Sequence, residues 1–177
     1  MNFQAAGVFE LLRQDNGHVD VRPKTRAQFW ETVEAEAPGL KNAAGCYVFV
    51  MFNSRSALPW YVGKAELQSF EREIFSLHKV HHYNEVVAYN KGTPYVFLIP
   101  RRTSRGAFCK PTKAKNKSIR LLETLLIGMA LRRNPQLRNV RDTSTLRKLR
   151  IEGVLNSKIK GRPGSAPMHL KWALRIT

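Results

Sequence analysis

Two segments near the middle of the chain, Cys46–Phe52 (CYVFVMF) and Pro59–Gly63 (PWYVG), decide the predicted fold. The first is a near-continuous run of β-branched, aromatic and other apolar residues, which is typical of a strand buried on both faces. The second reads as a short strand, and the polar loop Asn53–Leu58 separates the two. If the strands pair as neighbours, Tyr47 and Tyr61 come close together.

These two tyrosines have two interpretations. Buried tyrosines commonly pack in a core with the hydroxyl hydrogen-bonded, and the residues by themselves favour this interpretation. In the alternative, the strand ends face a ligand, because Gly63 ends its strand where the backbone can approach another group closely. The patterns leave both interpretations open.

Further elements surround the two strands. The sequence predicts helices over Thr25–Ala35, Ala65–Leu77 and Ser118–Arg133 and a third strand over Pro94–Ile99. Thr25 is the expected cap of the first helix, and apolar residues at helical spacing define the second. Asp15-Asn16-Gly17 predicts a hairpin turn. The expected fold class is α+β, with a small, mostly antiparallel central sheet flanked by helices.

The basic excess of the chain lies in its second part. The 177 residues carry a formal net charge of +17, and positions 101–177 hold 20 of the 30 Lys and Arg but three of the 13 acids. Such a one-sided field attracts polyanions, and each neutralised phosphate releases counterions. Nucleic acid is therefore the favoured partner over a membrane surface, for which we find no helix with basic and aromatic faces.

Composition excludes several other classes of protein. With 43% hydrophobic residues, the chain is not a disordered basic tail. The apolar run Leu121–Leu131 is interrupted by Glu123 and is too short to span a bilayer, and Met1–Arg13 lacks the basic start of a secretory signal. Cys46 and Cys109 have no metal-type spacing, so we expect reduced thiols in a cytoplasmic protein.

Glu123 is a carboxylate on an apolar helix face. Its neighbours at helical spacing are Ile119, Leu126, Ile127 and Ala130. Burying a carboxylate is costly unless another group compensates the charge. A divalent cation is one compensator, and an ion pair with Arg72 or Lys64 is another, so both remain open here.

The histidines His78, His81 and His82 follow the second predicted helix. No cysteine or further histidine completes a zinc set at the usual spacing, so a structural zinc site is disfavoured. The open alternatives are a catalytic base, a phosphate contact or ordinary surface residues. Arg72 lies nearly opposite the apolar stripe of its predicted helix, so its side chain should point to solvent or to a ligand.

In chain order, Gly45-Cys46-Tyr47, Tyr61-Val62-Gly63, Arg72 and Glu123 resemble the motif of the GIY-YIG nuclease family. That family usually has an asparagine after the glutamate helix, a position for which Asn139 is favoured over Asn134. Cys46 and Val62 replace the usual isoleucines, and Ser76 stands where members often have histidine. The resemblance covers residues 45–139. It leaves 1–44 as an N-terminal extension packing on the core and 140–177 as a basic C-terminal segment.

The resemblance implies a metal-dependent phosphodiesterase that hydrolyses DNA. Glu123 would hold Mg²⁺ (or Mn²⁺), and Arg72 would pair with the scissile phosphate. Tyr61 would position the phosphate or the water. Tyr47 would be the base or orient the water, which requires nearby positive charge to lower its pKa from about 10. Lys64, His78, His81 or His82 would assist as proton acceptor, with Gly63 and Asn139 in support.

The basic residues beyond position 100 would then grip DNA, in double-stranded form. They are Arg101, Arg102, Arg105, Lys110, Lys113, Lys115 and Lys117 in a predicted loop, followed by Arg132 and Arg133. A catalytically inactive nucleic-acid-binding protein with the same fold is the alternative. An RNA-binding or ribosome-associated protein fits the charge but leaves the tyrosines, Arg72 and Glu123 unexplained. Neither the target sequence nor the oligomeric state is predicted.

Overall fold

The computed structural model describes residues 2–54, 56–139, 143–148, 151–152, 154 and 164–173. The chain divides into two compact units, Met1–Asn139 and Val140–Thr177. In the second unit, the described helices are α5 (Thr143–Lys148) and α6 (Ser165–Ala173). Within the described ranges, no helix is long and apolar enough to cross a membrane.

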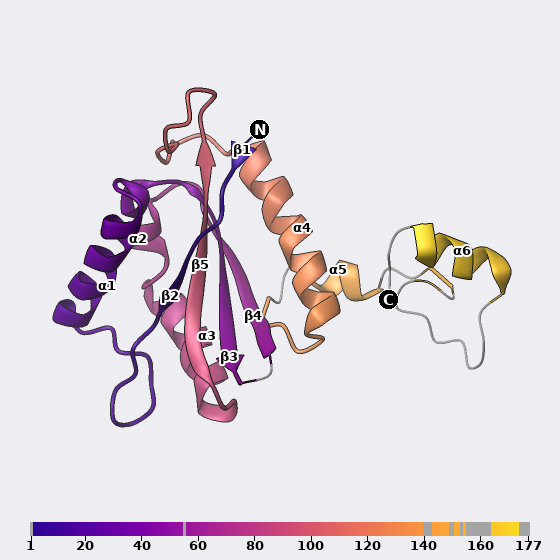
Figure 1. Ribbon diagram of the computed structural model, residues 1–177, viewed down its shortest axis with the longest axis horizontal. Helices are drawn as coiled ribbons and strands as arrows, with labels where there is room; N and C mark the ends of the chain where they lie inside the picture. The colour runs from indigo at the N-terminus through magenta and orange to yellow at the C-terminus, as the bar shows by residue number, and fades with distance from the viewer. Residues whose placement is uncertain are drawn as a thin grey trace. The chain divides into compact units, whose positions relative to one another are not determined.

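An antiparallel sheet forms the centre of the first unit (Figure 1). Strand β3 (Gly45–Asn53) lies between β4 (Ser56–Ala65) and β5 (Thr93–Arg102). The short strands β1 (Asn2–Phe3) and β2 (Ala6–Glu10) pair with the other edge of β5. The predicted α+β class with a small antiparallel sheet is confirmed.

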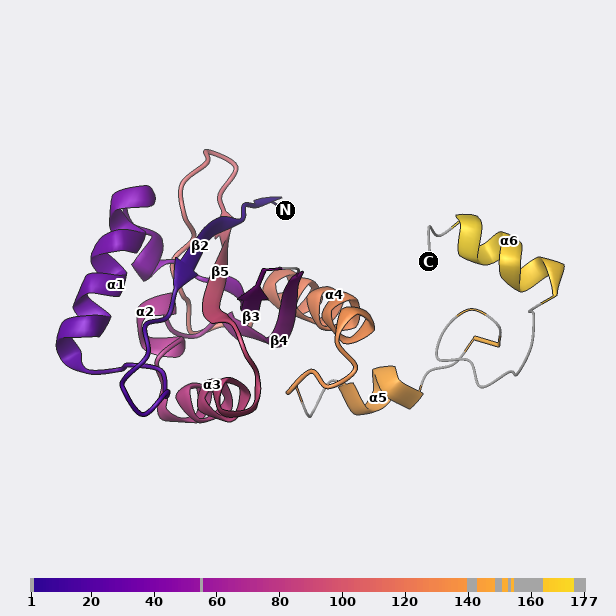
Figure 2. The same ribbon diagram turned by 60° about the horizontal axis from the view of Figure 1, so that its bottom comes forward.

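Helices cover both faces of this sheet (Figure 2). One face carries α1 (Pro23–Glu36), α2 (Phe70–Glu73) and α3 (Leu77–Tyr89), and the other carries α4 (Lys117–Arg133). A short 3-10 helix, η1 (Leu40–Asn42), follows α1. A sheet covered on both sides requires a central strand that is apolar on both faces.

Strand β3 meets that requirement through the alternation of its side chains. Tyr47, Phe49 and Met51 belong to the main core cluster, which includes residues of α1 and α3. Cys46 points to the opposite face, into a smaller cluster with Ile119 of α4. The Cys46 thiol donates to the Ile119 carbonyl oxygen at 3.3 Å, and burial raises its pKa to about 12. Cys46 therefore joins α4 to the central strand as a neutral thiol.

The N-terminal segment 1–44 contributes to the same core as the rest of the first unit. Phe9 and Leu11 are buried in the main cluster together with Trp30 and Val33 of α1. Because β2 pairs with β5, this segment also extends the sheet. Residues before the tyrosine strands are thus part of the structure that holds those strands in place.

The prediction of one helix over Ala65–Leu77 is wrong. Ala65 ends β4, and two separate helices follow, α2 and α3. Ser69 and Ser76 each adopt an extended backbone directly before one of these helices, a position that serine favours. Only the middle of the apolar stripe is buried: Phe70 and Ile74 are in the core, whereas Leu67 is 58% exposed and Leu77 is 89% exposed.

The predicted cap of the first helix is also wrong. Helix α1 begins at Pro23, whose fixed φ suits a first helical position. The Thr25 hydroxyl instead donates to the carboxylate of Asp20 at 2.8 Å. The backbone N–H of Arg22 donates to the same carboxylate at 3.0 Å, so Asp20 anchors the start of the helix from outside it.

The other predicted elements are present, with longer bounds. The turn at Asp15-Asn16-Gly17 forms with Gly17 at a φ of 83°, and Arg13 and Val19 bridge across it. The strand predicted over Pro94–Ile99 lies inside β5, and the helix predicted over Ser118–Arg133 is α4. Because β5 extends to Arg102, the irregular basic loop spans residues 103–116 rather than the predicted 101–117.

Candidate active site

The pairing of β3 with β4 places Tyr47 directly opposite Gly63. A Cβ atom on Gly63 would lie 2.3 Å from Cζ of Tyr47, so the ring fits against β4 because that side chain is absent. Gly45 is constrained in the same way, since its Cβ would lie 2.2 Å from the Ile99 carbonyl oxygen. The centroids of the Tyr47 and Tyr61 rings are 6.2 Å apart, as expected for neighbouring strands.

The side chain of Tyr47 is fully buried in the core. Burial, followed by the nearby Tyr83 and Tyr61, raises the pKa of Tyr47 well above its ordinary value. The hydroxyl therefore stays protonated at neutral pH. A role as base requires a lowered pKa, and therefore a cation beside Tyr47. The ammonium of Lys79 contacts the Tyr61 hydroxyl instead.

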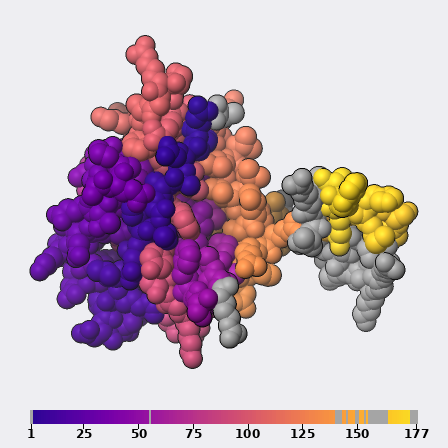
Figure 3. Space-filling view, viewed as in Figure 1, coloured from indigo at the N-terminus to yellow at the C-terminus, as the bar shows by residue number. Residues whose placement is uncertain are grey.

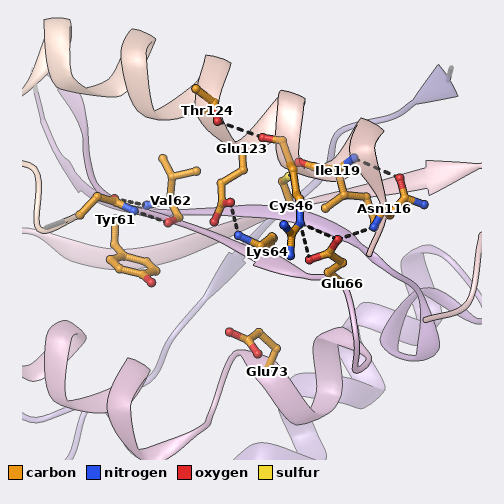
Figure 4. Close-up of polar contacts among 12 residues, drawn as sticks. Cys46, Tyr61, Val62, Lys64, Glu66, Glu73, Asn116, Ile119, Glu123 and Thr124 are labelled. Atoms are coloured by element: carbon orange, nitrogen blue, oxygen red, sulfur yellow. Dashed lines mark hydrogen bonds and ion pairs between the residues drawn. The ribbon is translucent and has the colours of Figure 1, made fainter. Parts of the chain in front are cut away.

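Glu123 lies in the middle of α4, on the face that packs against the sheet. It is 9% exposed, and Ile119 and Ile127 are buried one turn before and after it. Lys64, at the end of β4, donates a hydrogen bond to Oε2 of Glu123 and forms an ion pair with it (Figure 4). Of the two ion-pair partners considered from the sequence, Lys64 is the one in contact.

This ion pair lines a cleft with a volume of about 520 Å³. The residues around the cleft are Lys64, Glu66, Leu67, Gln68, Glu73, Lys79, Arg120 and Glu123. Among them, each carboxylate has a basic partner: Glu123 pairs with Lys64, Glu73 with Lys79 at 3.4 Å and Glu66 with Arg120 at 2.9 Å. In Figure 4, Glu73 faces Glu123 across this space. Tyr61 lies next to the cleft and is not among its lining residues.

Glu66 links the cleft to the first turn of α4. Burial acts to raise its pKa, but hydrogen bonds from Arg120 and from the backbone N–H of Asn116 outweigh burial and lower it. The Asn116 side chain caps α4 by accepting from the N–H groups of Ser118 and Ile119. The charged Glu66 thus holds the helix that carries Glu123 against the end of β4.

Lys79, on α3, is the cation that reaches Tyr61. Its ammonium donates to the Tyr61 hydroxyl at 2.6 Å and lies 3.4 Å from Glu73 Oε1. Burial lowers the pKa of Lys79, but Tyr61 and Glu73 outweigh burial and raise it. Arg72 is exposed on α2 and is not among the residues that line the cleft. Of the predicted set, Lys64 and Glu123 therefore line the cleft, and Tyr61 is joined to it through Lys79.

The three histidines occupy different environments on α3. His82 stacks on Tyr61, with ring centroids 5.4 Å apart, and burial lowers its pKa. His78 and His81 are exposed, although His78 packs edge-on against His82 at 4.5 Å. His82 is therefore the predicted proton acceptor that lies against Tyr61.

The two candidate asparagines both bind the outer edge of β4. Asn139 accepts from the N–H of Val62 at 2.9 Å and donates to its carbonyl oxygen at 2.7 Å. Asn134 donates to the carbonyl oxygen of Pro59 at 2.8 Å. An edge strand leaves such groups without a strand partner, and the amide of Asn139 satisfies them as a neighbouring strand would.

The predicted DNA-binding residues lie at the two ends of α4, on the loop before it and at the end of β5. That loop projects from the body of the first unit (Figure 3). Arg105, Lys110, Lys113, Lys115 and Lys117 are exposed, as are Arg132 and Arg133. Arg101 and Arg102 are half-buried in β5, and the guanidinium of Arg102 packs over the Phe108 ring at 4.5 Å.

No protein-family model, curated protein or solved structure matches this chain. Assignment of a function therefore depends on the chemistry of the cleft. Within the described ranges, no cluster of three or more His, Cys, Asp or Glu side chains could hold a metal ion. Mg²⁺ is commonly bound through one or two carboxylates, with water and substrate phosphate as its other ligands. Glu123, beside an open cleft, fits that mode.

Lys79, Glu73, Glu66 and Arg120 are cleft residues that the sequence analysis did not identify. A signal for Lys79 exists, because Val80, Tyr83 and Val87 recur at helical spacing and are buried in α3. Recognition of that helix would have placed Lys79 beside its buried face. The three ion pairs join residues at least six positions apart in the chain, and no local pattern predicts them.

Proposed function

We propose that this chain is a divalent-metal-dependent phosphodiesterase that hydrolyses DNA, with a GIY-YIG-like core. The observation that carries the proposal is that Glu123 and Lys64 meet in one cleft and that a lysine lining the same cleft donates to the Tyr61 hydroxyl. A carboxylate, a cation and a hydroxyl are the groups that phosphodiester hydrolysis needs for metal binding, charge stabilisation and orientation. The basic residues on and around α4 support a polyanionic substrate.

The predicted site residues in and next to the cleft receive roles that match their environments. Mg²⁺ on Glu123 would polarise the phosphate and stabilise the leaving oxygen. Lys64 stabilises negative charge on the phosphate beside it, and Tyr61 orients the attacking water or a phosphate oxygen. Tyr47 keeps its proton and holds the ends of β3 and β4 together. His82 is neutral at pH 7 and stacks on Tyr61, so we assign it as the candidate proton acceptor.

The second candidate is a catalytically inactive nucleic-acid-binding protein with the same fold. One observation favours it: the carboxylate of Glu123 already has a compensating charge in Lys64. Under this alternative, the ion pair is structural and the cleft binds no metal ion.

Supercoiled-plasmid conversion in the presence and absence of Mg²⁺ separates the two candidates. We expect Mg²⁺-dependent nicking or linearisation by the natural chain. Glu123→Gln should reduce it on the order of 10²–10³-fold, because the amide loses the negative charge that holds the cation. Binding to DNA should change little. Glu31→Gln removes a charge from the exposed surface of α1 and serves as the matched control.

The direct readout is Mn²⁺ binding followed by paramagnetic resonance, with no DNA present. Loss of binding in Glu123→Gln but not in Glu31→Gln supports the metal-dependent enzyme. Cleavage that survives in Glu123→Gln would rule out this residue as the metal ligand. A natural chain that binds DNA but neither Mn²⁺ nor Mg²⁺ would establish the inactive binding protein.

A further inference from the structure

The resemblance to the nuclease family implies a cation that contacts the scissile phosphate, and the sequence predicts that this cation is Arg72. In the structure, Arg72 lies on α2 and is exposed, and it does not line the cleft. Helix α2 ends at Glu73, and a separate helix, α3, begins directly after Ser76. This second helix carries a different cation. That cation is Lys79, whose side chain is 16% exposed and lines the cleft.

The hydrogen bonds around Lys79 leave donors that a ligand can accept. An ammonium group has three N–H donors. Tyr61 accepts one of them at 2.6 Å, and Glu73 lies 3.4 Å from the same nitrogen. Two donors are thereby directed within the protein, and a third can serve a ligand. The Tyr61 hydroxyl accepts from Lys79, which lines the cleft, and therefore has its own proton to donate to an oxygen bound beside Lys79.

The charge balance of the cleft indicates what kind of ligand this is. Among the described residues, Glu66, Glu73 and Glu123 are balanced by Lys64, Lys79 and Arg120. An additional cation on Glu123 would make the cleft positive, and a phosphate oxygen is then the complementary partner for an ammonium and a hydroxyl group.

We infer that Lys79 and Tyr61 together form the phosphate contact of this site and that Arg72 does not. This inference rests on the proposed function for its substrate, a DNA phosphodiester. Glu73 holds the ammonium in place, and Gln68 holds Glu73 by donating to its other oxygen, Oε2. The alternative is a purely structural Lys79 that supports the Tyr61 ring from within the core.

The salt dependence of DNA binding distinguishes contact from support. We would measure binding of a short duplex oligonucleotide between about 50 and 200 mM KCl, in a Glu123→Gln background so that cleavage does not interfere. Lys79→Gln keeps an N–H donor for Tyr61 and removes the charge. It should weaken binding and reduce the slope of log K against log salt concentration by about 0.9, the value for one phosphate contact.

Three further variants complete the experiment. Lys79→Arg should retain the slope of the parent, and Arg72→Gln should leave affinity and slope unchanged. Tyr61→Phe keeps the ring in place and removes the donated hydrogen bond, so affinity should fall about 3- to 10-fold with no change in slope. Thermal unfolding of each variant shows whether the core is intact.

The inference would be overturned if the slope of log K against log salt concentration were unchanged in Lys79→Gln, or if it were reduced in Arg72→Gln. If Lys79→Gln does not fold, Tyr61→Phe and Arg72→Gln decide: unchanged affinity in Tyr61→Phe, or a reduced slope in Arg72→Gln, overturns it. These outcomes do not depend on cleavage. An absence of Mg²⁺-dependent cleavage by the natural chain refutes the proposed enzyme, whereas the slopes test the phosphate contact by itself.

Discussion

At the scale of single residues, Gly63 determines how the two tyrosine strands can pair. The Tyr47 ring occupies the space that a side chain at this position would fill, with Cζ 2.3 Å from the site of a Cβ atom. Gly63 is not in the left-handed region, so the constraint is steric contact and not backbone conformation.

We therefore expect Gly63→Ala to lower the free energy of unfolding by about 1–3 kcal/mol, the usual cost of overpacking a core. Urea denaturation followed by circular dichroism measures this change. Gly128→Ala is the matched control, because nothing lies within 4 Å of its added Cβ in α4. That substitution should raise the free energy of unfolding by up to about 1 kcal/mol. Equal stability of the two variants would contradict the steric constraint.

Residue types predicted some of the site directly. An acidic side chain in the apolar pattern of α4 marked Glu123, and glycine beside an aromatic strand marked Gly63. The protonation behaviour of Tyr47 was not predictable, because it depends on complete burial among Tyr83 and Tyr61. Arg72 and Lys79 are equivalent in charge, and their places relative to the cleft follow from where one helix stops.

At the scale of elements, the ends of helices differ most from the sequence-based expectation. Asp20 lies outside α1 and still anchors its start, through the Arg22 N–H, the Arg22 guanidinium and the Thr25 hydroxyl. The Arg22 side chain, with smaller contributions from the Arg22 N–H and Thr25, holds the pKa of Asp20 well below its usual range. Because the pKa of Asp20 is lower in the folded chain than in the unfolded chain, the ionised carboxylate stabilises the fold fully at neutral pH. This stabilisation is lost progressively as the pH falls below about 4.

Asp20→Asn should accordingly lower the thermal unfolding midpoint at pH 7, and the difference from the natural chain should shrink at pH 3. Thermal denaturation at both pH values gives the comparison. Asp15→Asn, in the exposed turn just before, is the control, and its small effect should be similar at the two pH values. A difference for Asp20→Asn that grows on acidification would reverse the assigned sign.

At the scale of the first unit, positive charge flanks the helix that carries Glu123. Lys117 begins α4, and Arg132 and Arg133 end it. Glu123 lies six residues after Lys117 and nine before Arg132, about 9 and 14 Å along the axis at the rise of an α-helix. Basic groups at both ends of the helix would hold a DNA backbone across the cleft, and the loop before α4 adds further exposed basic residues.

Binding to duplex DNA should therefore weaken steeply as salt rises, and part of that dependence should come from the loop. We expect Lys113→Gln with Lys115→Gln to reduce the slope of log K against log salt concentration by up to about 1.8, for two phosphate contacts. Lys24→Gln with Lys91→Gln removes the same charge from exposed positions elsewhere and should leave the slope unchanged. Equal slopes for the two double variants would show that the loop is a solvated surface.

The sequence by itself determined the α+β class, the central strand, the helix with Glu123 and the segregation of charge. These features follow from local periodicity and composition, which a chain carries wherever it folds. The tertiary structure decided that Lys64 pairs with Glu123, that Lys79 lines the cleft where Arg72 does not, and that Asn139 completes the edge of β4. Such contacts join residues distant in the chain, and their energies depend on burial and geometry that exist only after the sheet and its helices have packed.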